Sequence, residues 1–451
     1  MKKALLLIGF VASATAFTAQ VSPAVSSWLQ NTSTIGTYYV AGNSTPVTLG
    51  ILEQCQQVEY NSTDVYISCT GVPGYPSGPF LDGNPSIAED QNAIFKFPLN
   101  PQENTGTLTE TSAGNIGVFI DGVALFDYRD GVSWDSNTGA PCGGPGGSPC
   151  TGSLDWNRDA IPAEMDGFDC SKGHPAGGNY HHHQNPSAFD LDLNVVSTIC
   201  TLYDADGLYA MDSTQHSPLI GYAYDGFPIY GAYGYQNEDG TGGIKRIESG
   251  YQLRSISVRT HHADGTNVDD GPAVDATYWL GYFREDYEWV AHPGDEEFLD
   301  EHNGRFCVTP EYPAGTYAYF CTVDSDWNSA YPYAIGPTFY GIYSNALVTS
   351  IPGGTTVYTG PTSISEELET LNYTVFPNPA SDLISVQIKG LVKKDLKVEL
   401  IDVAGKLVKS ATVNAGQTIA FIDVQDVYEG TYIIRISNAV NETTRKVVIT
   451  R

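Results

Sequence analysis

The chain has 451 residues, among them 47 Gly, 26 Pro and 29 Tyr, and its 52 Asp and Glu against 22 Lys and Arg give a formal net charge of −30 at pH 7. The length allows two or three domains with their own cores, and the many turn residues and tyrosines favour β-strands over helical bundles. The strong negative charge repels phosphate backbones, so we expect no nucleic acid among the partners.

The N-terminal residues have the pattern of a secretion signal. Lys2 and Lys3 precede an apolar run over residues 4–11, which is too short to span a bilayer, and small residues follow. We therefore predict a cleaved signal peptide over residues 1–19. No later stretch approaches the roughly 18 uncharged apolar residues of a membrane helix, so we expect no integral membrane segment in the mature chain.

Residues 20–350 are predicted to form a mainly β region. Short runs with alternating apolar side chains, such as residues 65–68, 117–120 and 317–320, are separated by clusters of Gly, Pro, Asn and Asp. We find no repeat with the period of a solenoid and no heptad pattern.

All eight cysteines lie within this β region. An even number of cysteines in an exported chain predicts disulfides, and thiolate metal ligation is a weak alternative because no C-x-x-C pair is present. The sequence does not fix the pairing. Pairs of sequence neighbours are the simplest hypothesis: Cys55 with Cys69, Cys142 with Cys150, Cys170 with Cys200, and Cys307 with Cys321.

A histidine-rich stretch carries the strongest chemical signal. In an extended strand His181 and His183 share a face, with Cα atoms roughly 6.6 to 7 Å apart, and His174 lies one Gly-rich turn upstream. Neutral imidazole is a common ligand of Cu and Zn, so these three residues are candidate metal ligands. His216 is a fourth candidate, at the start of a predicted strand, Asp-Gly turn and strand. The alternative is that the histidines only form hydrogen bonds inside an aromatic core.

The segment Tyr180-His181-His182-His183, with the blocks at residues 216–221 and 225–231, resembles the YHYH-domain family. His182 stands where the tetrapeptide of the family has its second Tyr. The resemblance extends over about residues 50–345 and implies no settled activity. Many relatives carry a second Tyr-His-Tyr-His, which corresponds here to Tyr317-Ala318-Tyr319-Phe320, without either His.

Motifs of other chemistries are absent from the sequence. There is no G-x-S-x-G elbow, no H-E-x-x-H and no phosphate-binding loop. The segment that begins at Asp204 starts like an EF-hand but lacks its later ligands. A looser Ca²⁺ site that uses Asp190, Asp192, Asp204 or Asp206 remains an open alternative.

The C-terminal part reads as a linker and a separate module. Residues 351–371 have the composition of a spacer, and residues 372–451 contain regularly spaced strands that predict a small β-sandwich. Its Pro377-Asn378-Pro379 opening, the turn over residues 402–406 and the ending at residues 446–449 resemble the sorting domain of type IX secretion substrates. The resemblance implies recognition by the outer-membrane export machinery and, usually, removal of the domain.

Together these patterns predict a mainly β fold, in which a disulfide-braced YHYH domain precedes a C-terminal β-sandwich sorting domain. The function hypothesis is a secreted or cell-surface protein with a histidine-based Cu or Zn site. The first alternative is a metal-dependent extracellular hydrolase or oxidase, in which an open metal position activates water or oxygen. The second is a structural or adhesive protein that binds extracellular glycans through Tyr-rich faces and needs no metal.

Overall fold

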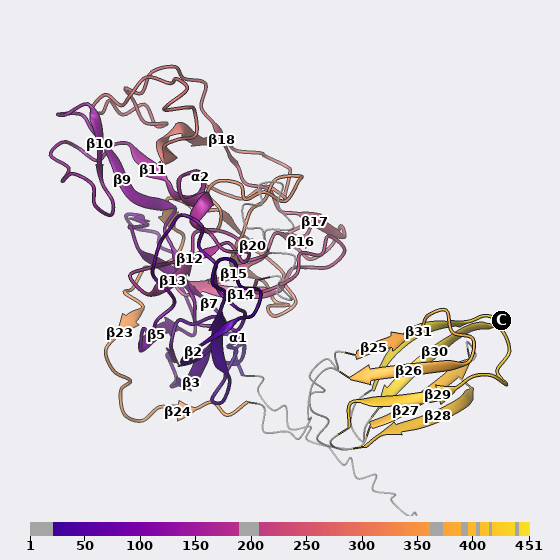
Figure 1. The fold of residues 1–451 in the computed structure, drawn as a ribbon. Coiled ribbons are helices and arrows are strands. Elements are labelled where there is room, and N and C mark those ends of the chain that lie inside the picture. Colours follow the sequence, from indigo (N-terminus) through magenta and orange to yellow (C-terminus); the bar gives the residue numbers. More distant parts are fainter. Residues whose placement is uncertain are drawn as a thin grey trace, which may run out of the picture. The chain divides into compact units, whose positions relative to one another are not determined.

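The computed structural model describes residues 21–188, 207–360, 373–388, 396–402, 406–414, 417–437 and 442–451. The chain divides into two compact units, Met1–Tyr358 and Thr359–Arg451 (Figure 1). Both units consist mainly of strands, which confirms the predicted fold class. The predicted signal peptide over residues 1–19 lies outside the described residues, as does the stretch 361–371 of the predicted linker.

Two large sheets form the centre of the first unit. The eight-stranded sheet has the order β12 (Gly173–Ala176), β13 (Asn179–His182), β8 (Ala124–Phe126), β7 (Asn115–Phe119), β14 (Leu219–Ala223), β15 (Pro228–Tyr230), β21 (Thr316–Phe320) and β20 (Gly304–Cys307). The five-stranded sheet has the order β23 (Leu347–Val348), β5 (Ala93–Pro98), β4 (Asp64–Cys69), β3 (Cys55–Tyr60) and β24 (Thr356–Val357). Because β24 pairs with β3, the first unit continues past residue 350, into the segment predicted as a linker.

Smaller elements surround these sheets. The small sheets pair β1 (Ile35–Tyr38) with β2 (Val47–Leu52), β16 (Tyr233–Tyr235) with β17 (Ile244–Arg246), β18 (Tyr251–Leu253) with β19 (Tyr287–Trp289), β22 (Thr338–Phe339) with β6 (Thr109–Glu110), and β9 (Arg129–Asp135) with both β10 (Ala140–Gly143) and β11 (Asn157–Asp159). The described helices are the short α1 (Pro23–Ser26) and α2 (Ala160–Glu164) and the 3-10 turns Met165–Gly167 and Arg284–Asp286. None of the helices in the described part of the chain is long and apolar enough to cross a membrane.

Side chains of both large sheets share one hydrophobic core. Phe97 of β5 packs against Tyr222 of β14, with 5.9 Å between the ring centroids, and Trp28 contacts both rings. Tyr230 and Tyr319 are fully buried in the same core. Large aromatic side chains bury more apolar surface than aliphatic ones, so this cluster holds the eight-stranded sheet against the five-stranded sheet.

The eight-stranded sheet repeats one four-stranded motif in its two halves. In the first half β7 and β8 form a hairpin, β13 runs parallel to β8, and β12 pairs antiparallel with β13. In the second half β14, β15, β21 and β20 have the same order and directions. An Asp-Gly turn closes each inner hairpin, with φ of 84° at Gly122 and 91° at Gly226, a region that glycine adopts without strain.

The register of the outer hairpins makes residues of the two halves equivalent. His182 pairs with Gly173 in the first half, and Tyr319 pairs with Gly304 in the second. Counting along the strands from these pairs, the equivalent residues are Asp169 and Asp300, His174 and Arg305, Tyr180 and Tyr317, His181 and Ala318, and His183 and Phe320. The two halves therefore share a backbone plan but differ at all three candidate ligand positions.

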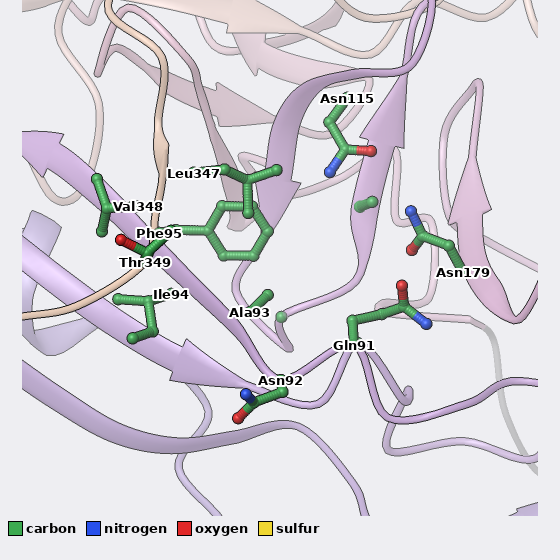
Figure 2. Close-up of a pocket in the computed structure, with 13 residues that line it drawn as sticks. Gln91, Asn92, Ala93, Ile94, Phe95, Asn115, Asn179, Leu347, Val348 and Thr349 are labelled. Carbon is green, nitrogen blue, oxygen red and sulfur yellow. The ribbon is translucent and has the colours of Figure 1, made fainter.

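A cavity of about 320 Å³ lies where strands of both large sheets meet. Figure 2 shows the Phe95 ring and side chains of β23 on one side, and on the other the amides of Gln91, Asn115 and Asn179. The described residues that line this cavity include no charged side chain.

The cysteines follow the predicted pairing only in part. Cys142 and Cys150 form a disulfide, and Cys170 is disulfide-bonded, although its predicted partner Cys200 lies outside the described residues. Cys55 and Cys69 lie opposite each other on β3 and β4, yet both are free thiols, so the predicted bridge between them is not formed.

The predicted bridge between Cys307 and Cys321 is not formed, and both residues are buried free thiols. Cys307 pairs with Thr316 across β20 and β21, and Cys321 lies five residues beyond Thr316. At about 3.3 Å per residue this separates the two cysteines by roughly 16 Å, far beyond the Cα distance that a disulfide allows. The predicted pairing is wrong because the register of this hairpin places Thr316, and not Cys321, opposite Cys307.

The second unit is a β-sandwich of two sheets. One sheet has the order β25 (Tyr373–Phe376), β26 (Leu383–Ile388) and β29 (Ile419–Asp423), and the other has the order β28 (Leu407–Val413), β27 (Leu396–Asp402), β30 (Gly430–Ser437) and β31 (Glu442–Ile449). A separate apolar core of alternating residues, such as Val386, Val398 and Ile434, joins the sheets. The predicted turn around Ala404 and Gly405 lies outside the described residues.

Candidate metal centre

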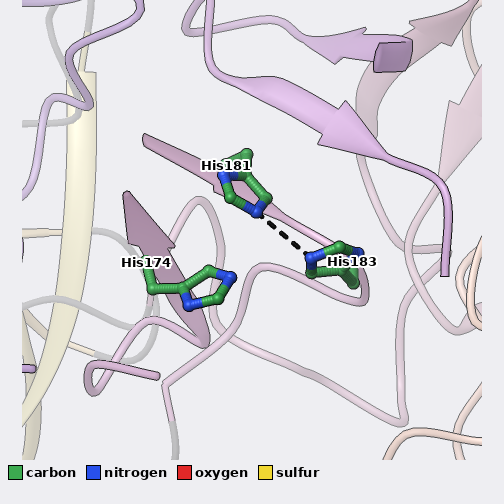
Figure 3. A group of neighbouring side chains, drawn as sticks. All are labelled: His174, His181 and His183. Carbon is green, nitrogen blue, oxygen red and sulfur yellow. Dashed lines mark hydrogen bonds between the residues drawn. The ribbon is translucent and has the colours of Figure 1, made fainter. Parts of the chain in front are cut away.

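Three histidines converge at the outer end of the eight-stranded sheet. His174 of β12 pairs with His181 of β13, and His183 follows directly after β13. All three are buried, and their candidate ligand atoms lie within 4.8 Å of one another. Figure 3 shows the three rings directed toward one another, with His181 Nε2 and His183 Nε2 3.1 Å apart. The placement of residues 181 and 183 on one face agrees with strand alternation.

Backbone carbonyls fix the orientation of two of these rings. His181 Nδ1 lies 2.9 Å from the carbonyl oxygen of Asn179, and His183 Nδ1 lies 2.5 Å from that of Asp127. A carbonyl oxygen only accepts hydrogen bonds, so both Nδ1 atoms carry the hydrogen and both Nε2 atoms present a lone pair. Phe126 stacks on His181, with 3.8 Å between ring centroids, and restricts its rotation.

A carboxylate completes the group. Oε2 of Glu164, at the end of α2, lies 3.3 Å from His174 Nε2 and 3.2 Å from His183 Nε2. The side chain of Asp159 accepts a hydrogen bond from Ile161 N and so caps the start of α2. The spacing of the histidines contains no signal for Glu164, because the chain reaches the centre through a helix outside the hairpin.

The charges in this group shift the pKa values of its members in opposite directions. Burial tends to raise the pKa of Glu164, but hydrogen bonds and charge from His174 and His183 outweigh burial and lower it well below its usual range. Burial tends to lower the pKa of His183, but the contact with Glu164 raises it above 6.5. For His181, burial and the neighbouring imidazoles together hold the pKa well below 6.5.

His182 points to the other side of β13 and has a structural role. Its Nε2 lies 2.7 Å from Tyr75 Oη, and its Nδ1 lies 3.0 Å from the carbonyl oxygen of Lys172. The edges of Phe119 and Tyr180 enclose the ring. Burial lowers the pKa of His182 to about 3, so the ring stays neutral in the folded protein.

His216, the fourth candidate ligand, is not part of the group. It lies in the second half of the fold, where it packs against Tyr230, Tyr235 and Phe320. Its Nδ1 lies 2.7 Å from the carbonyl oxygen of Ser217. The structure therefore gives His216 no place beside the other three histidines. The four Asp residues of the alternative Ca²⁺ site, Asp190, Asp192, Asp204 and Asp206, lie outside the described residues.

One side of the centre faces a cavity of about 810 Å³. Glu164 and His174 line this cavity together with Leu81, Asp82, Asn84 and Ser86. His181 and His183 do not line it. Access to the centre from solvent thus runs past Glu164 and His174.

The fold and this centre define a mainly β protein with a buried group of three histidines that can hold a metal ion. The family model described as YHYH protein matches residues 94–331, more than half of the chain, and the chain belongs to this family. A second model, described as secretion system C-terminal sorting domain, matches residues 374–450. Both resemblances seen in the sequence are confirmed. No match is found among curated proteins.

The sorting domain gives the destination of the chain. It indicates export by type IX secretion, which delivers a protein to the cell surface or the medium. The export machinery at the outer membrane is therefore a partner of this protein.

Proposed function

We propose that His174, His181 and His183 bind one transition-metal ion, Cu or Zn, in the exported protein. The observation that carries the proposal is the 3.1 Å distance between His181 Nε2 and His183 Nε2, both of which present lone pairs. Two lone pairs this close repel each other unless a proton or a metal cation lies between them. A metal ion satisfies both, and His174 Nε2 adds a third nitrogen donor.

Glu164 supplies negative charge that offsets the charge of a bound cation. Its carboxylate contacts two of the three imidazoles and brings a negative charge into the buried group. Three neutral imidazoles and one carboxylate leave a divalent ion with a single net positive charge, which is easier to bury than a bare one. The carbonyl partners of His181 and His183 are the outer hydrogen bonds that orient metal-binding imidazoles.

Metal analysis of purified variants tests the proposal. The wild-type protein is expected to bind one Cu or Zn per chain, whereas His181→Ala with His183→Ala should lose stoichiometric binding, measured by isothermal titration and elemental analysis. His216→Ala is the matched control, because it removes a half-buried imidazole in the other half of the sheet and should keep the metal. Equal affinity in the wild type and the double variant, with both folded by circular dichroism, would contradict the proposal.

The cavity beside Glu164 and His174 favours a working metal centre over a purely structural one. Structural zinc sites are closed by four protein ligands, while catalytic sites keep one position open to a ligand. A metal-dependent hydrolase or oxidase is therefore the enzyme class that this arrangement supports. The reacting groups would be those that line the cavity.

A second candidate function is binding of a neutral, hydroxyl-rich ligand such as a glycan. The predicted binding through Tyr-rich faces has no support from Tyr180, Tyr222 and Tyr319, because these side chains are buried and cannot contact a ligand. The support comes instead from the uncharged cavity of Figure 2, where amides can bond hydroxyl groups beside the Phe95 ring. Saturable binding of a neutral monosaccharide that survives removal of the metal would favour this function.

A further inference from the structure

We infer that the metal ion keeps an exchangeable coordination position on the side of Glu164 and His174, and that the acidic cavity there admits neutral or cationic ligands and repels anions. This inference rests on the proposed metal site. It adds the kind of molecule that reaches the ion and the residues that select it.

The closed and open sides of the centre follow from its neighbours. Phe126 stacks on His181 and contacts the edge of His183, with 3.8 and 5.9 Å between ring centroids, and so covers one side. The ring of Phe168 packs against the ring of His174, with 4.8 Å between the ring centroids, and covers a second side of the centre. The side of Glu164 and His174 borders the cavity of about 810 Å³, with His174 Nε2 and Glu164 Oε2 buried beneath its surface. A small ligand therefore reaches the ion from this side.

The loop over residues 82–86 contributes to the lining of the cavity and is anchored to β12. Asn84 Nδ2 donates to the carbonyl oxygen of Pro175 on β12 at 2.9 Å, and Asn84 N donates to Asp82 Oδ1 at 2.9 Å. The Asp82 carboxylate lies against Gly167, where an added Cβ would come within 2.8 Å of Oδ2. The loop thus places a carboxylate beside Asp166 at the mouth of the cavity.

The charges that line the cavity are of one sign. Asp82, Glu164 and Asp166 line it, and among the described residues that line it there is no Lys or Arg. Carboxylates that border the same concave space add their potentials, which raises the local concentration of cations and lowers that of anions; because Asp82 and Asp166 are exposed, salt screens this effect. The cavity therefore suits small neutral or cationic molecules with a nitrogen or oxygen donor, such as amines and polyols. It disfavours phosphate esters and carboxylates.

Two probe ligands test both parts of the inference on the full-length protein loaded with Cu(II), or with Co(II) if only Zn is retained. Imidazole, a neutral donor, is expected to give a saturable change in the visible spectrum of the metal. Azide, an anion, is expected to bind more tightly to Asp82→Asn with Asp166→Asn than to the wild type, by about 3- to 10-fold at low ionic strength, with imidazole affinity within about twofold. Asp264→Asn, at an exposed turn outside the cavity, is the matched control and should change neither affinity.

The possible results separate the two proposals. Absence of metal from the wild-type protein would end the proposed function itself. If the protein binds metal stoichiometrically but the visible spectrum does not change with imidazole, the ion has no exchangeable coordination position. That result would overturn this inference and leave the proposed function standing. Azide affinity in the wild type should also rise with added inert salt, because salt screens the carboxylates, and this measurement needs no variant. Azide affinity that responds neither to salt nor to the two substitutions would overturn the selection by charge.

Discussion

In the first half of the eight-stranded sheet β13 carries His181, whereas β21 of the second half carries Ala318 at the equivalent position, and His183 corresponds to Phe320. The third candidate ligand, His174, corresponds to Arg305, whose guanidinium lies over the Phe320 ring, 5.5 Å from its centroid. One backbone plan thus supports a histidine group that could hold an ion in one half, and an arginine packed on an aromatic ring in the other.

Arg305 shows what replaces the ion in the second half. Its guanidinium donates to the carbonyl oxygens of Tyr235, Gln236 and Glu296. A cation that belongs to the chain therefore lies near the position where the first half presents three nitrogen donors. Side-chain identity at a few positions, rather than topology, decides which half can take up metal.

The largest expected difference between the halves is their response to metal. At a free metal concentration 100-fold above Kd, binding adds about 2.7 kcal/mol to any opening that releases the ion. Backbone amides of β12 and β13 should then exchange about 100-fold more slowly, while those of β20 and β21 change little. Hydrogen exchange followed by mass spectrometry measures both hairpins in one sample. Equal protection of the two hairpins would show that the halves open together.

The shared scaffold can be tested by removing the same hydroxyl from each half. Tyr180 Oη donates to Asp169 and Tyr317 Oη donates to Asp300, at 2.8 and 2.9 Å. Tyr180→Phe and Tyr317→Phe should each lower the free energy of unfolding by about 1–3 kcal/mol, because each leaves a carboxylate short of one partner. Tyr180→Phe should cost more, since Asp169 is fully buried. Urea unfolding of the metal-free proteins gives both values.

If either variant left the free energy of unfolding nearly unchanged, the two hydroxyl groups would not have equivalent roles in the two halves. Tyr282→Phe provides a reference for the loss of a hydroxyl outside the repeated motif.

A further expected difference is the pH dependence at His182, whose equivalent is Tyr319. Burial lowers the pKa of His182 to about 3 in the folded state, against 6.5 in the unfolded chain. Its contribution to stability is therefore complete above pH 6.5 and is lost as the pH falls toward 3, by up to about 1.4 kcal/mol per pH unit. His182→Tyr should reduce this slope in urea unfolding of the metal-free protein between pH 7 and pH 4.

His181 contributes a slope of the same sign in both proteins, so the difference between them isolates His182. Identical slopes would mean that His182 is not held neutral by burial. Metal content should be the same in both proteins, because residue 182 faces away from the centre.

Much of the fold could be predicted because it depends on local patterns. Alternating apolar residues located β4, β7 and β21, and the same alternation placed His181 and His183 on one face. His174 was predictable because a Gly-rich turn returns the chain to pair with β13.

Features that depend on contacts distant in sequence could not be predicted. Glu164 reaches the centre through α2, and no sequence spacing links it to the histidines. His216 shares the sequence hallmarks of a ligand, but the strand order puts it in the second half. The repeat itself escaped detection because it is expressed in strand order and in a few Asp, Gly and Tyr positions.

The most direct test of the metal site is a crystal structure of the metal-loaded protein with anomalous diffraction recorded at the Cu or Zn edge. The account predicts a single anomalous peak within the group of His174, His181 and His183, about 2.0–2.1 Å from each Nε2 atom, and none beside Arg305. A map with no peak at these three histidines, or with the metal held by other residues, would contradict it.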